Sequence, residues 1–152
     1  MSPEFRAWMH PDDLVLYQLD LLPWPAYTRL VERFFEENDY RTRLIASEAG
    51  RTEFLLIAKT GVRYILHCCS VKAASDRGEL DRLRRNMNRF QVEAGLLATP
   101  RDFGVTLISA ARGLPVELYS GNRLRAKIEM LAAERRRAVM DSIRPTPEPD
   151  RG

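Results

Sequence analysis

Apolar side chains recur every three or four positions from residue 25 to residue 38, a spacing that predicts an amphipathic helix. The apolar members of this stretch are Tyr27, Leu30, Val31, Phe34 and Phe35. Arginine and glutamate fill most of the other positions, and Pro25 suits a first helical turn. Three extended segments are predicted next, at residues 40–46, 52–59 and 63–71, with a turn-like Thr-Gly-Val between the last two.

The second half of the chain alternates between helical and extended patterns. Asp76 and Glu79 resemble a helix-capping pair, and the helix that follows them is expected to stop at Gly95. Four further elements are predicted: a strand at residues 96–99, a helix at 102–112, a strand at 116–119 and a helix at 123–137. Strands that alternate with helices favour parallel pairing through right-handed crossovers.

These elements predict one α/β domain, a mixed β-sheet flanked by helices in the order α-β-β-β-α-β-α-β-α. A chain of 152 residues is the right size for a single core. We expect residues 1–24 to form an N-terminal arm, residues 25–137 the domain, and residues 138–152 a flexible C-terminal tail.

Composition says more about the class of protein and its expected location than about its function. Hydrophobic residues make up 45% of the chain and charged residues 30%, as in soluble globular proteins. The apolar runs are far shorter than a bilayer requires, so no membrane association is expected. Cys68 and Cys69 are neighbours on a predicted strand and would point to opposite faces, which disfavours a bridge between them. With no apparent export signal, we predict a reducing, cytoplasmic location.

Several segments carry a family resemblance. The segment LVERFFEENDY at residues 30–40 resembles the opening helix of the Mrr-type branch of the restriction-endonuclease-like, PD-(D/E)xK, superfamily. RYILHCC at residues 63–69 resembles that family's YLVQCK strand, and GLLAT at 95–99 resembles its next strand. The stretch from residue 103 to residue 131 is similar to the family's closing pattern, so the likeness covers about residues 27–131.

The resemblance implies a metal-dependent nuclease site with several altered positions. In the family, acidic residues on the second and third strands hold a divalent metal, and a lysine two residues later helps to stabilise the transition state. The corresponding third-strand positions are His67 and Cys69, which supply neither a carboxylate nor a permanent positive charge. Counting back along the hairpin places the second-strand acid at Phe54, and the opening helix has Thr28 where many relatives have a glutamate. The resemblance therefore implies a restriction-endonuclease-like fold with a degenerate site and no assigned catalytic residue.

Acidic and basic side chains at other positions would restore the catalytic groups of such a site. Glu53 adjoins Phe54 but is expected on the opposite face of the strand, unless the register differs by one residue. Lys72, or Lys59, would supply a displaced ammonium group. Zinc binding is disfavoured, because His67 and Cys69 share one face of the strand while Cys68 points to the other, which leaves two ligands. A Cys-His nucleophile pair is also disfavoured, because no acidic residue is identified that would orient the histidine. No metal is assigned and no cofactor is expected, and magnesium is implied only if the chain is an endonuclease with relocated residues.

A basic ridge on the helix after Asp76 is the candidate DNA contact. Arg82, Arg85 and Arg89 recur at helical spacing, away from the apolar stripe of that helix, and Lys72 precedes them. A solvated helix face is the plain alternative. The net charge of +3 is too small to identify a nucleic-acid partner by itself.

The leading interpretation is a pseudo-nuclease, a catalytically degenerate Mrr-type domain that binds DNA through phosphate contacts. One alternative is a metal-dependent DNA endonuclease that uses relocated residues such as Glu53, His67 and Lys72. Another is a protein-interaction or homodimer-forming module with Trp8, Trp24 and the apolar lead-in as its contact surface. Whether any cleavage activity exists would separate the first two.

Overall fold

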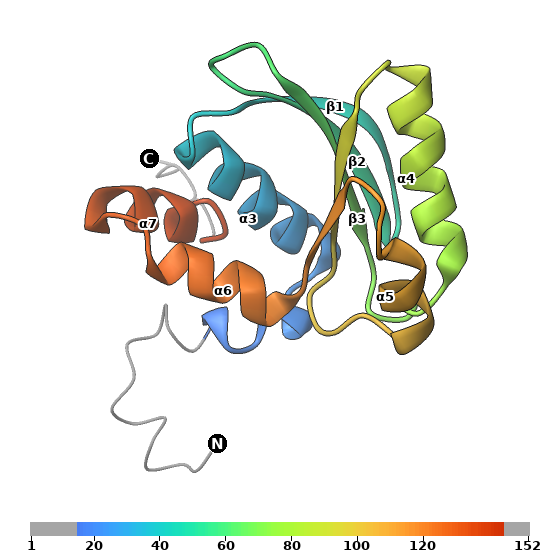
Figure 1. Ribbon diagram of the computed structural model, residues 1–152. Helices are drawn as coiled ribbons and strands as arrows, with labels where there is room; N and C mark the ends of the chain where they lie inside the picture. The colour runs from blue at the N-terminus through green and yellow to red at the C-terminus, as the bar shows by residue number, and fades with distance from the viewer. Residues whose placement is uncertain (1–14, 145–152) are drawn as a thin grey trace.

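A computed structural model describes residues 15–144 and consists of one five-stranded sheet between two layers of helices (Figure 1). The strands are β1 (Arg41–Glu48), β2 (Arg51–Ile57), β3 (Arg63–Cys69), β4 (Ala94–Ala98) and β5 (Val116–Tyr119). They lie side by side in chain order. The first three are antiparallel, and β3, β4 and β5 are parallel, which confirms the predicted mixed sheet.

The helices divide between the two faces of the sheet. They are α3 (Trp24–Glu37), α4 (Arg77–Arg89), α5 (Val105–Ala111), α6 (Gly121–Glu129) and α7 (Ala133–Asp141), with a short 3₁₀ turn at η1 (Leu19–Leu21). Helices α3, α6 and α7 share one buried cluster with the sheet, whereas α4 and α5 share another (Figure 1). Because side chains alternate along a strand, successive residues of β2 and β3 enter different clusters.

The C-terminal helical region differs from the prediction of one helix at residues 123–137. The chain instead forms α6 and α7, which are separated by a turn that contains Met130 and Leu131. This turn lets α7 lie against α3, where Val139 and Met140 join the core. The sequence has neither glycine nor proline at the turn, so no local signal marks it.

The ends of the domain extend beyond the predicted limits of residues 25 and 137. Leu16 and Leu19 are buried against the α3 side of the sheet, so this part of the expected arm belongs to the core. Residues 138–141 are helical, and the predicted tail boundary therefore cuts through α7. Residues 1–14, with Trp8, and residues 145–152 lie outside the described part of the chain. None of the helices within residues 15–144 is long and apolar enough to span a membrane.

Candidate functional site

The register of β2 against β3 brings Glu53 directly opposite His67. The expectation that Glu53 points to the other face was therefore wrong, and Phe54 is the residue that faces away, into the α3-side core. The reason lies in the hairpin, where the Ala58 N–H donates to the Val62 carbonyl and Ile57 pairs with Arg63. If the pairing of β2 with β3 were shifted by one residue, Glu53 and Phe54 would exchange faces of the sheet.

Five polar side chains meet beneath α4, and we call them the buried charge cluster: Arg51, Glu53, His67, Glu79 and Asn86. The His67 Nε2 atom lies 2.6 Å from Glu79 Oε2. On the other side of the ring, Nδ1 lies 3.2 Å from Glu53 Oε1. These two atoms are close enough for an ion pair, but their geometry is not that of a hydrogen bond. The imidazole of His67 is thus held between two carboxylates, one from β2 and one from α4.

Hydrogen bonds from neighbouring residues hold both carboxylates in place. The Arg51 guanidinium donates to Glu79 through Nε at 3.2 Å and through Nη2 at 2.5 Å. The Asn86 amide donates to Glu53 Oε2. Helix α4 supplies Glu79 and Asn86 together because they are seven residues apart, two helical turns, and lie on its inward face. The cluster is therefore tied to both β2 and α4.

The cluster favours a protonated histidine. Burial on its own would lower the pKa of His67, but the carboxylates of Glu53 and Glu79 together raise it above its ordinary value. Burial likewise opposes ionisation of Glu79, but His67 and Arg51 lower its pKa to about 2. Contact with His67 also lowers the pKa of Glu53. With His67 protonated, two negative and two positive side chains balance one another.

This arrangement does not fit the divalent metal that the family resemblance implied. His67 is fully buried, and its two ring nitrogens are already directed at the carboxylates that would serve as the other ligands. Magnesium requires near-octahedral oxygen ligands and retains several waters. Within residues 15–144, no group of three or more His, Cys, Asp or Glu side chains is arranged to hold a metal ion. The His67 ring occupies the place between the carboxylates that a cation would otherwise take.

The other altered positions add no charged group to the buried charge cluster. Thr28 is buried in α3, on the other side of the sheet, and donates to the Pro25 carbonyl at 3.1 Å. Cys68 enters the α3-side core and Cys69 the α4-side core, so the two adjacent thiols remain free and face opposite ways. Burial, with the nearby charge of Glu79, raises the pKa of Cys69 to about 12. A neutral thiol therefore stands at the third-strand lysine position of the resemblance.

Arg51, rather than Lys72, supplies the cation that reaches the buried carboxylates. Lys72 is exposed beyond the end of β3, and among residues 15–144 no ion pair of the cluster includes it. The sequence pattern pointed to neither Arg51 nor Glu79 as a site residue, and it predicted Glu79 as a capping residue. Asp76 alone caps α4, through the Gly78 N–H at 2.8 Å. The usable signal was spacing, because Arg51 and Glu53 are two residues apart and share a strand face.

The three ridge arginines, Arg82, Arg85 and Arg89, lie on the solvent side of α4, as predicted from their spacing. Within the described part of the chain, neither Arg82 nor Arg85 forms an ion pair. The Arg89 guanidinium lies over the Phe90 ring at 5.0 Å from its centroid. We call these three side chains the arginine ridge, and they face away from the buried charge cluster across the thickness of α4.

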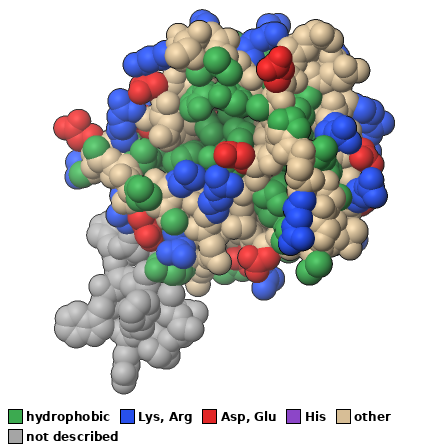
Figure 2. All heavy atoms as spheres, in the orientation of Figure 1, with side chains coloured by type: hydrophobic (Ala, Val, Ile, Leu, Met, Phe, Trp, Pro, Cys, Tyr) green, Lys and Arg blue, Asp and Glu red, His purple; other side chains and the backbone are tan. Residues whose placement is uncertain are grey.

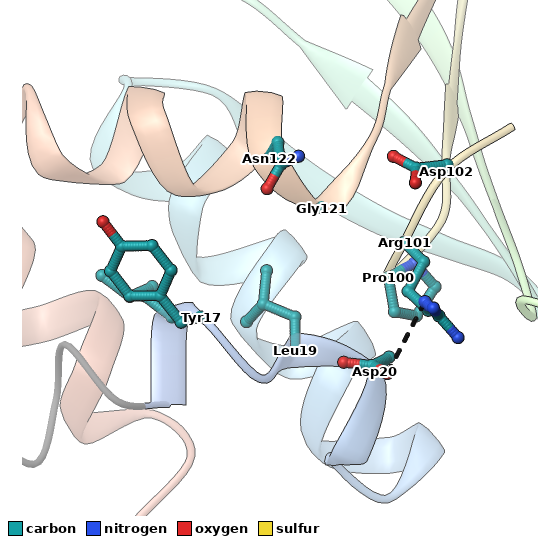
Figure 3. A pocket seen from close by; sticks show the side chains of 9 residues that line it. Tyr17, Leu19, Asp20, Pro100, Arg101, Asp102, Gly121 and Asn122 are labelled. Carbon is teal, nitrogen blue, oxygen red and sulfur yellow. Dashed lines mark ion pairs between the residues drawn. The ribbon is translucent and has the colours of Figure 1, made fainter. Parts of the chain in front are cut away.

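Other hollows lie on the surface of the described residues, away from this cluster. The polar one, of about 280 Å³, is found where β4 and β5 end, between η1 and the start of α6. Figure 3 shows that Arg101 turns toward Asp20 across its mouth, while Asp102 and Asn122 lie on the far side. Asp20 and Asp102 outnumber the single arginine, so this hollow does not suit a phosphate group.

Two further hollows, of about 350 and 370 Å³, adjoin each other and share Phe35, Tyr40 and Tyr119. Hydrophobic side chains are visible in a depression on the face that carries α6 (Figure 2). Tyr119 is flanked by Arg123, whose Cζ lies 4.4 Å from the ring centroid. Nothing in the geometry of these two hollows specifies a ligand.

Comparisons with known proteins agree with this fold. A family model described as a restriction endonuclease, the Mrr catalytic domain, matches residues 19–128. This chain therefore belongs to the Mrr-type restriction endonuclease family. No curated protein gives a significant sequence match.

A solved structure supports the fold independently. The DNA modification-dependent restriction endonuclease AspBHI superposes with a TM-score of 0.55 at 16% sequence identity. The match covers 94% of this chain but 42% of AspBHI, so this chain corresponds to less than half of that protein. At this identity the likeness establishes a shared restriction-endonuclease-like fold.

Proposed function

We propose that this chain is a non-cleaving Mrr-type domain that binds DNA through phosphate contacts. The observation that carries the first half of the proposal is the buried imidazole of His67, held between Glu53 and Glu79. Membership of the family and the exposed arginine ridge support the second half. The domain would recruit or hold DNA rather than cut it.

Hydrolysis of a phosphodiester needs an activated water and a positive charge beside the phosphate as negative charge develops. In the buried charge cluster both carboxylates already have partners: Glu53 lies against His67, and Glu79 lies against His67 and Arg51. Helix α4 covers the cluster, and Glu79 is 2% exposed, so a phosphate would have to displace that helix to reach it. At the lysine position, the Cys69 thiol stays neutral because burial raises its pKa to about 12.

The arginine ridge has the properties of a phosphate-binding surface. Three guanidinium groups recur along about two turns of one helix face, and a guanidinium presents paired N–H donors that match phosphate oxygens. Arg82 and Arg85 have no carboxylate partner within residues 15–144 that would compete with a phosphate. Contacts of this kind would give affinity with little dependence on base sequence.

Binding would be measured by fluorescence anisotropy with a labelled duplex at several salt concentrations. Replacing Arg82, Arg85 and Arg89 with Gln should weaken binding to unrelated sequences and reduce the salt slope by about 2.7, about 0.9 for each phosphate contact. The matched control replaces three exposed arginines away from α4, Arg29, Arg112 and Arg137, and removes the same charge. Equal weakening by both triple variants would remove the ridge from the proposal.

Cleavage would be tested with supercoiled and linear DNA in the presence of Mg²⁺ or Mn²⁺. The proposal expects intact DNA under all these conditions. A specific observation favours the endonuclease alternative, because Glu53 and Glu79 converge on one point and Arg51 is close to them. Metal-dependent cleavage that disappears in Glu53→Ala would establish that alternative. Failure to bind DNA even at low salt, together with stable self-association, would favour an oligomerisation module.

A further inference from the structure

A small hollow lies between the edge strand β1 and the end of α4. Its volume is about 240 Å³, and its lining is Arg43, Leu44, Ile45, Leu55, Arg89 and Phe90. Four of these side chains are apolar and two are arginines, and no acidic side chain lines it. This combination distinguishes it from the acidic hollow beside Asp20 and from the tyrosine-lined hollows.

The apolar part of the hollow is open to solvent. Leu44 belongs to β1, which has a partner strand on one side only, and its side chain is 57% exposed. Leu55 lies in the neighbouring strand β2 and is buried against the α4 side. Phe90 closes the other wall, where α4 ends. An apolar surface between two strands and an aromatic ring suits a flat, weakly polar group such as a nucleobase.

The two arginines place positive charge at the mouth of this apolar surface. Arg43 is exposed on β1, and the Arg89 guanidinium lies over the Phe90 ring. Within residues 15–144, neither of these arginines forms an ion pair. Arg89 is also the last member of the arginine ridge, so the hollow continues the proposed path of the DNA backbone.

We propose that this hollow accepts one unpaired base of a DNA strand, while the phosphates on either side of that base contact Arg43 and Arg89. The inference rests on the proposed function and adds a substrate class to it, namely DNA that contains an unpaired nucleotide. Base stacking on apolar and aromatic side chains together with arginine contacts to the backbone is the general mode of single-strand binding. A fully paired duplex would use the ridge but leave the hollow empty.

The test compares a blunt duplex with the same duplex carrying a short single-stranded overhang, again by anisotropy. The wild-type chain should bind the overhang DNA roughly tenfold more tightly, in line with the usual contribution of one stacked base. Phe90→Ala and Leu44→Ser should each reduce this preference and leave affinity for the blunt duplex unchanged. Leu44 is exposed on the edge strand, so its replacement keeps the test valid if Phe90→Ala fails to fold. Val105→Ser is the matched control, because Val105 is an exposed apolar residue, 79% accessible, on α5.

The possible results distinguish failure of this base-binding hollow from failure of the proposed DNA-binding function. A preference that persists in both hollow variants overturns the site. A wild-type chain that binds both DNAs equally, with affinity that still depends on Arg82 and Arg85, overturns the site but leaves the proposed function standing. Absence of binding to either DNA overturns both. Loss of the preference in the hollow variants, with its retention in Val105→Ser, supports the site.

Discussion

Replacing Glu79 with Gln removes one negative charge from the buried charge cluster while keeping the size of the side chain. In the native chain, His67 and Arg51 lower the Glu79 pKa from 4.5 to about 2. Each unit of a pKa difference between the folded and unfolded states is worth about 1.4 kcal/mol, so the ionised carboxylate stabilises the fold by about 3 kcal/mol at neutral pH. Removal of one partner of a buried ion pair lowers the free energy of unfolding by a similar amount, about 3–5 kcal/mol.

The sign of the pKa shift makes this cost dependent on pH. A carboxyl group with a lowered folded-state pKa contributes stability above its unfolded pKa, 4.5, and loses it as the pH falls toward about 2. Glu79→Gln should therefore lower the free energy of unfolding by about 3 kcal/mol between pH 5 and pH 7, as order-of-magnitude values, and by much less near pH 3. The expected fall in Tm at pH 6 is about 6–12 °C for a chain of this length.

Urea unfolding followed by circular dichroism across this pH range would measure the difference. Glu48→Gln is the matched control, because Glu48 pairs with the same Arg51 at 3.0 Å from the solvent side and is mostly exposed. An exposed pair of this kind is worth about 0–1 kcal/mol. A Glu79→Gln cost below about 1 kcal/mol, or one that does not change between pH 3 and pH 7, would refute the account of the cluster.

Three further outcomes are expected. The free energy of unfolding of the wild-type chain should be highest between about pH 4.5 and pH 6.5. Below this range Glu79 loses its stabilising contribution, and above it His67, with its raised pKa, loses its own. A pH series of urea unfolding midpoints would measure this. Cys68 and Cys69 are both buried with raised pKa values, so a thiol reagent should react with neither in the folded chain and with both in urea. Gly121→Ala should lower stability by about 2 kcal/mol or more in thermal denaturation, because a Cβ atom there would lie 2.1 Å from the Pro100 carbonyl oxygen.

Most of the fold was predictable from periodicity. The apolar spacing of α3, the short apolar runs of β2 and β3, and the capping residue Asp76 are local signals, and the structure confirms the elements that they predicted. The turn between α6 and α7 was not predictable in this way. Its cause is the burial of Val139 and Met140 against α3, and that contact involves residues more than a hundred positions apart.

The candidate site was predictable only in part. His67 and Cys69 followed directly from the likeness of β3 to the family's strand, whereas the partner of His67 depended on hairpin register. A difference of one residue separates Phe54 from Glu53, and the sequence of the turn does not determine which of them faces α4. Glu79 and Arg51 were missed because a charged residue in a first helical turn, or near a strand end, is usually solvent-exposed. Their burial becomes apparent only when α4 is packed on the sheet.

The protonation state of His67 tests the central claim most directly. The chain contains two histidines, so a His10→Asn variant leaves His67 as the single imidazole. The ring nitrogens of His67 would be observed by long-range ¹H–¹⁵N correlation at pH 6.5, before and after the addition of excess Mg²⁺. We expect both nitrogens to carry protons and their shifts to stay unchanged with the metal. A neutral ring, or shifts that respond to Mg²⁺, would contradict the account.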